Sequence, residues 1–319
     1  MPPRPIHPPQ SFHRAVERGT RTDSGEPGAS YWQQRVNYAI AASLNTESAR
    51  IRGRETVTYF NNSPDTLNRI LFHLAQNVYA AGATRNRSVP ITGGVTLGSV
   101  KVAGQPVVTS LYNESSRYYV EPTLLVVPLP TPLTPHTSTA VELEWAYTVP
   151  PAPTFRSANL DNDVFAVAQW YPRVAVYDDI YGWDTTPYLG DGEFYLEYGD
   201  FDVSLTVPAG WLIAATGVLV NSDDVLSAGV RRKLDMAERS SEVVHVVTPG
   251  DVGAATLGSP GDELTWHFTA HDVRDFAWST SRNYVWDVAS GDGGVVSHDG
   301  GVDGSQTRVD GRRFRQLLG

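Results

Sequence analysis

Two histidines four residues apart, in the segment HFTAH, come closest to a metal-binding pattern in this sequence. On a helix, that spacing brings both imidazoles to one face, as in the zinc-binding motif His-Glu-x-x-His. Here Phe268 stands where the motif has its glutamate, and residues 264–270 alternate between apolar and polar side chains as in a strand. Along a strand, His267 and His271 would lie about 13 Å apart. We therefore expect histidines on a strand surface and assign no metal ligand to this chain.

Paired carboxylates offer a second chemistry, because two acids at a suitable separation hydrolyse glycosidic bonds. Asp178 and Asp179 lie beside tyrosines in the sequence. Four more acids follow: Asp191, Glu193, Glu197 and Asp200. The glycines among them favour turns, since Asp accepts backbone hydrogen bonds there. No G-x-S-x-G motif and no glycine-rich phosphate-binding motif is present, and we assign no catalytic residue.

The elements that position these residues are β-strands. Residues 36–44 and 51–59 alternate between apolar and polar side chains, and the turn residues NTES separate them, which predicts an antiparallel hairpin. Similar segments recur along the chain with Pro and Gly between them. The best candidate for a helix is the short segment DVRDFAWSTS. The pattern predicts an all-β fold, either a large antiparallel β-sandwich or a curved sheet.

The composition divides the chain into three parts. Residues 1–30 are rich in Pro, Arg, Gly and Ser and predict a flexible N-terminal arm. Residues 31–287 carry the strand pattern and predict one β domain. Residues 288–319 are rich in Gly, Asp and Arg, and we expect them to be disordered or to be a truncated junction.

Charge and composition exclude several classes of protein. The 319 residues carry a formal net charge of −10, which argues against a nucleic-acid partner because phosphate binding needs basic clusters. Cysteine is absent, so disulfides and thiolate metal sites are excluded. No apolar run approaches the roughly 20 residues of a membrane span. No secretory leader is visible at the start, so the compartment stays open: cytoplasmic, or secreted if the true start lies upstream.

Three segments in order resemble the N-terminal domain of the aminopeptidase N family of zinc metallopeptidases. The first is YWQQRVNYAIAASLNTESARIRGRETVTYFNNSPDTLNRILFHLAQN, similar to the opening hairpin of that family. The second is AQWYPRVAVYDDIYGWDTTPYLGDGEFYLEYGDFDVSLTVPAGWLIAATGVL, similar to its central segment. The third is WHFTAHDVRDFAWSTSRNYVW, similar to the segment that closes the domain. Together they cover about residues 31–287.

The resemblance implies a saddle-shaped β domain that packs against a thermolysin-like catalytic domain. In that family, the catalytic domain carries H-E-x-x-H and the exopeptidase motif G-x-M-E-N, and neither occurs here. We therefore expect the chain to be inactive alone, with zinc and the peptide substrate bound only through the absent catalytic domain. A family Gln or Glu that holds the substrate amine corresponds to Gln169, with Asp163 as the alternate. Gln169 as a strand residue bonded to backbone is an equal interpretation.

Two alternatives stay open. The chain could be a stand-alone β-sandwich that binds peptide or carbohydrate through aromatic side chains. The tryptophans considered for that role are Trp170, Trp183, Trp211 and Trp266. It could also be a glycosidase, with Asp179 and Glu193 as the two acids to test.

Overall fold

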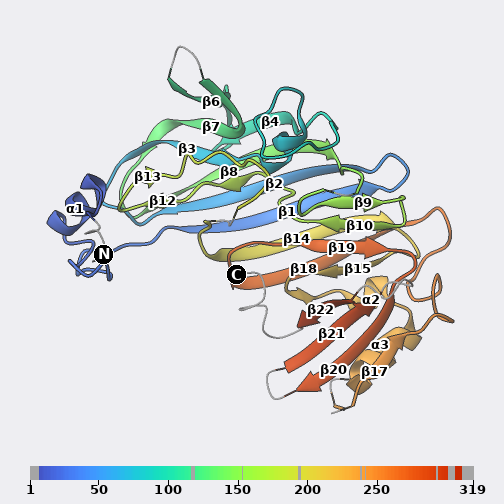
Figure 1. The fold of residues 1–319 in the computed structure, drawn as a ribbon. Helices are drawn as coiled ribbons and strands as arrows, with labels where there is room; N and C mark the ends of the chain where they lie inside the picture. Colours follow the sequence, from blue (N-terminus) through green and yellow to red (C-terminus); the bar gives the residue numbers. More distant parts are fainter. Residues whose placement is uncertain are drawn as a thin grey trace, which may run out of the picture.

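The computed structural model describes residues 7–115, 119–152, 154–192, 195–237, 239–240, 242–291, 294–300 and 306–310. Strands dominate these residues, as the alternating sequence pattern predicts, and the all-β class is confirmed. Figure 1 shows one long, twisted sheet with shorter sheets beside it. The strands are arranged in five sheets of eight, four, four, two and four strands.

The large sheet has the strand order β16-β18-β14-β1-β2-β8-β4-β5. Its strands are β1 (Arg35–Asn45), β2 (Arg50–Asn61), β4 (Thr96–Val102), β5 (Gln105–Pro106), β8 (Thr137–Thr148), β14 (Gly199–Pro208), β16 (Val218–Leu219) and β18 (Glu263–Val273). β1 and β2 form the predicted antiparallel hairpin, in continuous register from Arg35 opposite Phe60 to Asn45 opposite Arg50. Along both strands, buried and solvent-facing side chains alternate.

The sheet is mixed, which corrects the prediction of a purely antiparallel one. β1 pairs with β14 in parallel, with Tyr38 opposite Phe201 and Ser43 opposite Thr206. A parallel pair needs a long connection between its strands. Here, the chain runs through β3 to β13, which belong partly to the large sheet and partly to the smaller ones, before it returns to pair along β1. Period-two alternation specifies which face a strand buries, and it does not specify the direction of its neighbour.

Four smaller sheets complete the fold. Two four-stranded sheets have the orders β15-β19-β10-β9 and β11-β3-β7-β6. Their strands are β15 (Leu212–Ala215), β19 (Trp278–Ser281), β10 (Val164–Val167), β9 (Ala158–Leu160), β11 (Arg173–Val174), β3 (Leu67–His73), β7 (Tyr119–Leu133) and β6 (Ser110–Ser115). The others contain β12 (Tyr177–Asp178), β13 (Gly182–Trp183), β17 (Val244–Val247), β20 (Val285–Gly291), β21 (Gly294–Gly300) and β22 (Gln306–Asp310).

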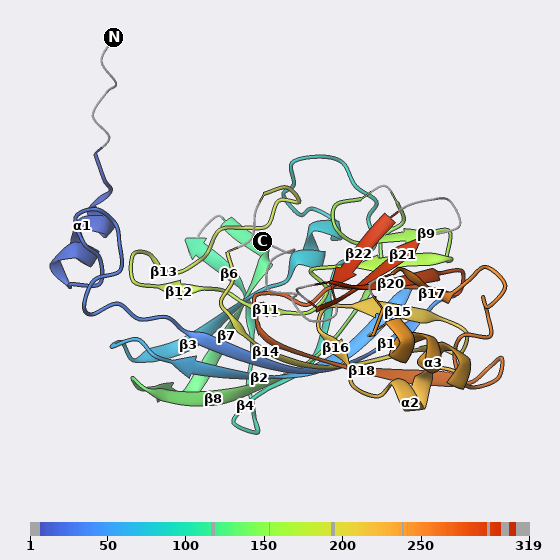
Figure 2. The ribbon, with the colours of Figure 1, turned by 90° about the horizontal axis from the view of Figure 1, so that it is seen from below.

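The core lies between the large sheet and the smaller ones. Figure 2 shows the large sheet as the lower layer, with β9, β10, β12 and β13 above it. Inward-facing residues of both layers form one cluster, including Val57 of β2, Phe72 of β3 and Phe165 of β10. Burying such side chains contributes roughly 1.5–3 kcal/mol each. In the part of the chain that the structure describes, no second sheet lies on the outer face of the large sheet, and solvent-facing residues such as Arg52 and Arg54 of β2 lie there (Figure 2).

Helices are short and differ from the one that was predicted. Residues 272–281 do not form a helix: the segment ends β18, turns and becomes β19, because Trp278 to Ser281 pair with β10 and β15. The α-helices are α1 (Gln10–Glu17), α2 (Ser222–Val225) and α3 (Ala228–Ala237), and η1 (Ala75–Tyr79) is a 3₁₀ helix. None of the described helices is long and apolar enough to span a membrane.

The two ends of the chain contain regular structure where the sequence predicted little. Residues 10–17 form α1, with Ala15 fully buried, and Arg21 anchors the following turn through Asp179. Residues 1–6 of the predicted arm lie outside the described residues. In the Gly-rich tail, the backbone of β20, β21 and β22 forms an antiparallel sheet with β17. Residues 292–293, 301–305 and 311–319 lie outside the described residues.

Candidate functional site

Gln169, the candidate for binding a substrate amine, lies in the loop between β10 and β11 with an unusual backbone. Its φ is +54°, in the left-handed region that Gln rarely adopts. A buried glutamine fixes this conformation: Gln76 Nε2 donates to the carbonyl oxygens of Gln169 at 3.0 Å and Ala168 at 3.3 Å. Ser157 Oγ accepts from the same Nε2 and from the Ala168 N–H, each at 3.2 Å. The loop is thus held rigidly by polar contacts.

The side chain of Gln169 has no hydrogen-bond partner among the described residues, although it is only 3 % exposed. The second interpretation, a strand residue whose side chain bonds to backbone, therefore has no support in the geometry. Gln76 Oε1 is also buried without a partner. Buried polar atoms of this kind are uncommon, and each calls for an explanation such as a ligand, a water or a missing partner.

Asp163, the alternate residue, is occupied. Arg282 donates to its Oδ1 from Nε at 3.1 Å and from Nη2 at 2.7 Å, and the pair is largely solvent-exposed. The carboxylate is therefore already neutralised. Of the two residues singled out from the sequence, only Gln169 has a free side chain.

The aromatic residues after Gln169 are part of the core. Trp170 Nε1 donates to the carbonyl oxygen of Phe276 at 2.8 Å. Tyr171 Oη donates to Asp275 Oδ1 at 2.7 Å, and Arg173 Nη1 donates to Asp275 Oδ2 at 3.1 Å. Burial raises the pKa of Tyr171 well above its usual value, so this phenol stays protonated. These contacts fasten the loop after Gln169 to the loop between β18 and β19.

The acidic pair after this loop shapes turns. Asp179 is bound by Arg21, which donates from Nε at 2.9 Å and from Nη2 at 2.8 Å. Burial raises the pKa of Asp179, but the hydrogen bonds from Arg21 outweigh it and the net pKa is lowered. Asp178 Oδ1 accepts the N–H groups of Ile180 and Tyr181. The turn interpretation fits both residues, and Glu193, the other glycosidase candidate, lies outside the described residues.

Glu197 is the acid of this region with the most altered titration. It lines a small cavity of about 80 Å³ together with Asp178, Tyr195 and Arg274. Burial, followed by the charge of Asp178, raises the pKa of Glu197 to about 7, and Arg274 opposes the shift. Glu197 is therefore partly protonated near neutral pH.

The two histidines of HFTAH lie on β18, as the strand pattern predicts. His267 Nε2 lies 2.9 Å from Asp202 Oδ1, and His271 Nδ1 lies 3.3 Å from Asp200 Oδ1. Each histidine thus has a single carboxylate neighbour on β14. Within the described residues there is no group of three or more His, Cys, Asp or Glu side chains that could hold a metal ion.

The tryptophans considered for a binding module are not available on the surface. Trp170, Trp211 and Trp266 are at most 7 % exposed. Trp183 is half-buried and packs against Tyr177, with ring centroids 5.1 Å apart. These four side chains therefore do not form an exposed aromatic patch.

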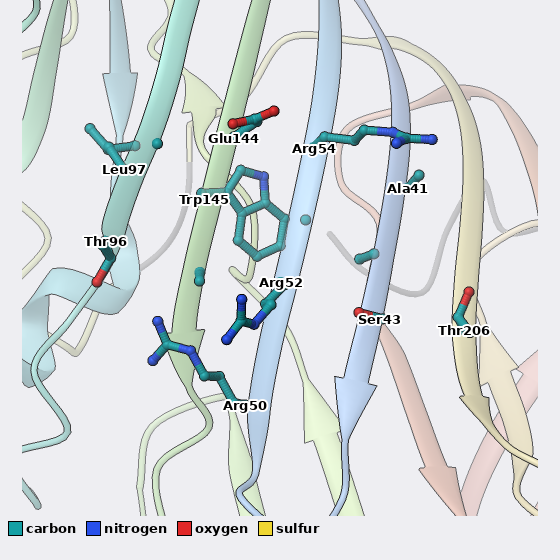
Figure 3. A pocket seen from close by; sticks show the side chains of 14 residues that line it. Ala41, Ser43, Arg50, Arg52, Arg54, Thr96, Leu97, Glu144, Trp145 and Thr206 are labelled. Atoms are coloured by element: carbon teal, nitrogen blue, oxygen red, sulfur yellow. The ribbon is translucent and has the colours of Figure 1, made fainter. Parts of the chain in front are cut away.

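A hollow of about 550 Å³ lies on the outer face of the large sheet, and no motif pointed to it. Figure 3 shows Arg50, Arg52 and Arg54 of β2 around it, with Glu144 of β8 at one end and Thr206 of β14 at the side. The signal in the sequence is ARIRGRET, where arginines occupy alternate positions. Alternate positions of a strand share a face, so the row could have been read from the sequence.

Comparison with known proteins gives a structural likeness only. No family model matches the chain, and no curated protein matches it. An M1 zinc metallopeptidase mutant from Deinococcus radiodurans bound to a Tyr-Ser-Ala substrate shares 14% sequence identity at a TM-score of 0.44, over 85% of this chain and 48% of that one. The M1 zinc metallopeptidase from the same organism shares 13% identity at a TM-score of 0.42 over the same shares. The chain spans about half the length of these structures, and it resembles part of an M1 metallopeptidase.

Proposed function

We propose that this chain is the non-catalytic N-terminal β domain of a zinc-dependent aminopeptidase and that it forms one wall of the substrate cleft. Three sequence segments, in the family's order, support the proposal. The second of them contains Gln169, and the observation that carries the proposal is the conformation of this residue. Its left-handed backbone is over-determined by Gln76 and Ser157, while its side chain has no partner.

The left-handed backbone of Gln169 is energetically unfavourable, and packing alone does not explain why the chain adopts it. A non-glycine residue held in the left-handed region is strained by about 1–3 kcal/mol, and such residues cluster at functional sites. The network around Gln76 orients the Gln169 backbone and leaves its amide unused. The buried Nε2 of Gln169 has no partner, and Oε1 of the same amide makes no hydrogen bond within the described residues. An amide oxygen of this kind can accept a charge-assisted hydrogen bond from an ammonium group.

We assign Gln169 a role in binding the substrate and no role in catalysis. The described residues contain no group that fits a zinc ion, so the proposal assigns no metal ligand and no chemical step to them. In the complete enzyme, zinc would supply the activated water from another domain. Gln169 would hold the substrate's free amine and so restrict cleavage to the first peptide bond.

The test compares the chain alone with the gene product from its source. An antibody against residues 31–287 isolates the natural product, and release of the amino-terminal residue from aminoacyl amides is measured with and without a chelator. We expect chelator-sensitive activity in the isolated material and none from the 319-residue chain. An isolated product of the chain's own size without activity would contradict the proposal.

The role of Gln169 is tested separately in the active form. Gln169→Ala should raise KM roughly tenfold or more for substrates with a free amine, since a charge-assisted contact is lost. Asp163→Ala is the matched control and should leave KM unchanged. Equal effects of the two variants would contradict the assignment of Gln169.

A further inference from the structure

Arg50, Arg52 and Arg54 of β2 lie opposite different kinds of residue in the two neighbouring strands, β1 and β8. Arg50 lies opposite Asn45 of β1 and Thr148 of β8. Arg52 lies opposite Ser43 and Ala146, again without a charge.

Only Arg54 has an acid directly across the sheet. It lies opposite Ala41 of β1 and Glu144 of β8. Arg50 and Arg52 therefore form a locally positive region at one end of the row, in a chain whose net charge is −10.

None of the three arginines takes part in an ion pair or hydrogen bond within the described residues. Two charged pairs do form on this face: Lys101 lies 3.8 Å from Glu142, and His267 lies 2.9 Å from Asp202. The chain has 35 acidic residues against 25 basic ones, so acids are plentiful. The absence of a carboxylate beside Arg50 and Arg52 is therefore a local feature of this part of the sheet.

The hollow gives these arginines room to meet a ligand. Small side chains line its floor, including Ala41, Ser43 and Ala146, and Gly53 lies between Arg52 and Arg54. Figure 3 shows the guanidinium groups of Arg50 and Arg52 turned toward the same place over β8. The guanidinium group of Arg54 is turned the other way, toward β1.

Two cations that converge without an anion repel each other, and an anion between them would remove that cost. A guanidinium group presents a planar fork of donors that fits phosphate oxygens in a bidentate manner. A phosphoryl dianion is tetrahedral and can accept from two forks at once, whereas one carboxylate has two oxygens to share. The hydroxyls of Ser43 and Thr96 also line the hollow and can donate.

We propose that Arg50 and Arg52 form a binding site for a phosphoryl group on the outer face of the large sheet. The site is independent of the proposed peptidase role. The phosphoryl group could belong to inorganic phosphate or to a small phosphate ester, and the shared chemistry is the dianionic PO₃ group. Arg54 takes no part in the site.

Titration calorimetry at constant ionic strength tests the site with inorganic phosphate and with glycerol phosphate. The chain should bind one equivalent, with a Kd on the order of 1 mM or below. Arg50→Gln with Arg52→Gln should weaken binding roughly tenfold or more, because both forks are lost. Arg54→Gln is the matched control, since it removes the same charge from the same strand, and it should change Kd less than about twofold.

Two results would overturn the proposal. One is the lack of saturable phosphate binding by the unaltered chain. The other is an equal loss in Arg54→Gln and in the double variant, which would indicate attraction to net charge. Thermal unfolding of each variant confirms that these solvent-facing substitutions leave the fold intact. Tighter binding of glycerol phosphate than of inorganic phosphate would favour an ester as the ligand, and tighter binding of inorganic phosphate would favour the free ion.

Discussion

Glu55 tests the fold because its carboxyl group is buried in the core, where a charge is unfavourable. It lies in the middle of β2, on the inner face, opposite Ile40 of β1 and Leu143 of β8. Its side chain is buried, and neither carboxyl oxygen has a hydrogen-bond partner among the described residues. Burial raises the pKa of Glu55 well above its ordinary value of 4.5. We predict that Glu55→Gln makes the protein markedly more stable at neutral and alkaline pH relative to the unaltered chain.

The magnitude follows from proton linkage. Above pH 4.5 the unfolded chain loses the proton of Glu55 while the folded chain keeps it, so the folded state binds more protons. The free energy of unfolding therefore falls as pH rises, by about 1.4 kcal/mol per pH unit, until the pH reaches the folded-state pKa. The loss ends at the folded-state pKa, which burial places well above 4.5. Gln cannot ionise, so the variant lacks this loss.

The assay is urea unfolding of both proteins at about pH 5, 6 and 7. The difference in unfolding free energy between Glu55→Gln and the unaltered chain should grow as pH rises, at up to about 1.4 kcal/mol per pH unit below the folded-state pKa. Glu144→Gln, on the exposed face of the neighbouring strand, is the control for the loss of a surface carboxyl group. A constant difference for Glu55→Gln would refute the reasoning and would mean that this carboxyl is solvated or paired.

Three further predictions concern other parts of the molecule. Glu197→Gln should also gain stability over the unaltered chain as pH rises above 4.5, by at most about 3.4 kcal/mol. The gain should level off above about pH 7, where Glu197 is ionised in the fold, and a gain that continues to rise in urea unfolding would contradict this. Gly53→Ala should destabilise the folded protein by about 1–3 kcal/mol, because the new Cβ would lie 2.3 Å from the Trp145 ring. A change in the near-UV circular dichroism of the tryptophan should accompany this loss of stability. An unchanged unfolding curve would mean that the ring moves freely. Asp179→Asn removes the charge that holds Arg21, so trypsin should cleave after Arg21 faster while the β domain stays intact; equal cleavage rates would show that other contacts anchor this segment.

Much of the fold is predictable because half-buried strands repeat every two residues. The β1–β2 hairpin follows from alternation on both sides of NTES. The short turn between β4 and β5 follows from Ala103 and Gly104, whose φ values of +48° and +76° lie in the left-handed region that favours glycine. These elements are predictable because residues close together in the sequence determine them.

Elements that depend on distant partners are not predictable in this way. The parallel pairing of β1 with β14 joins segments more than 150 residues apart in the sequence. Residues 278–281 of this segment form a strand rather than a helix because they pair with β10 on one side and β15 on the other. The helix α3 did have a local signal, since Val230, Leu234 and Ala237 lie three or four residues apart.

In the candidate site, too, some features follow from local sequence and others depend on distant residues. Gln169 was identifiable from a sequence resemblance, but its left-handed backbone depends on Gln76, which lies far away in the sequence. The role of Asp179 in binding Arg21 depends on residues 10–30 folding back on the β domain. Arg50 and Arg52 were visible as an alternating pair, and only the register of β1 and β8 shows that they lack an acidic neighbour.

The most direct test of the proposed function is the nucleotide sequence that follows codon 319, read in all three frames. The proposal predicts a His-Glu-x-x-His motif with a distant Glu in one of the frames, because the zinc site must belong to another domain. A stop codon followed by no such motif in any frame would contradict it.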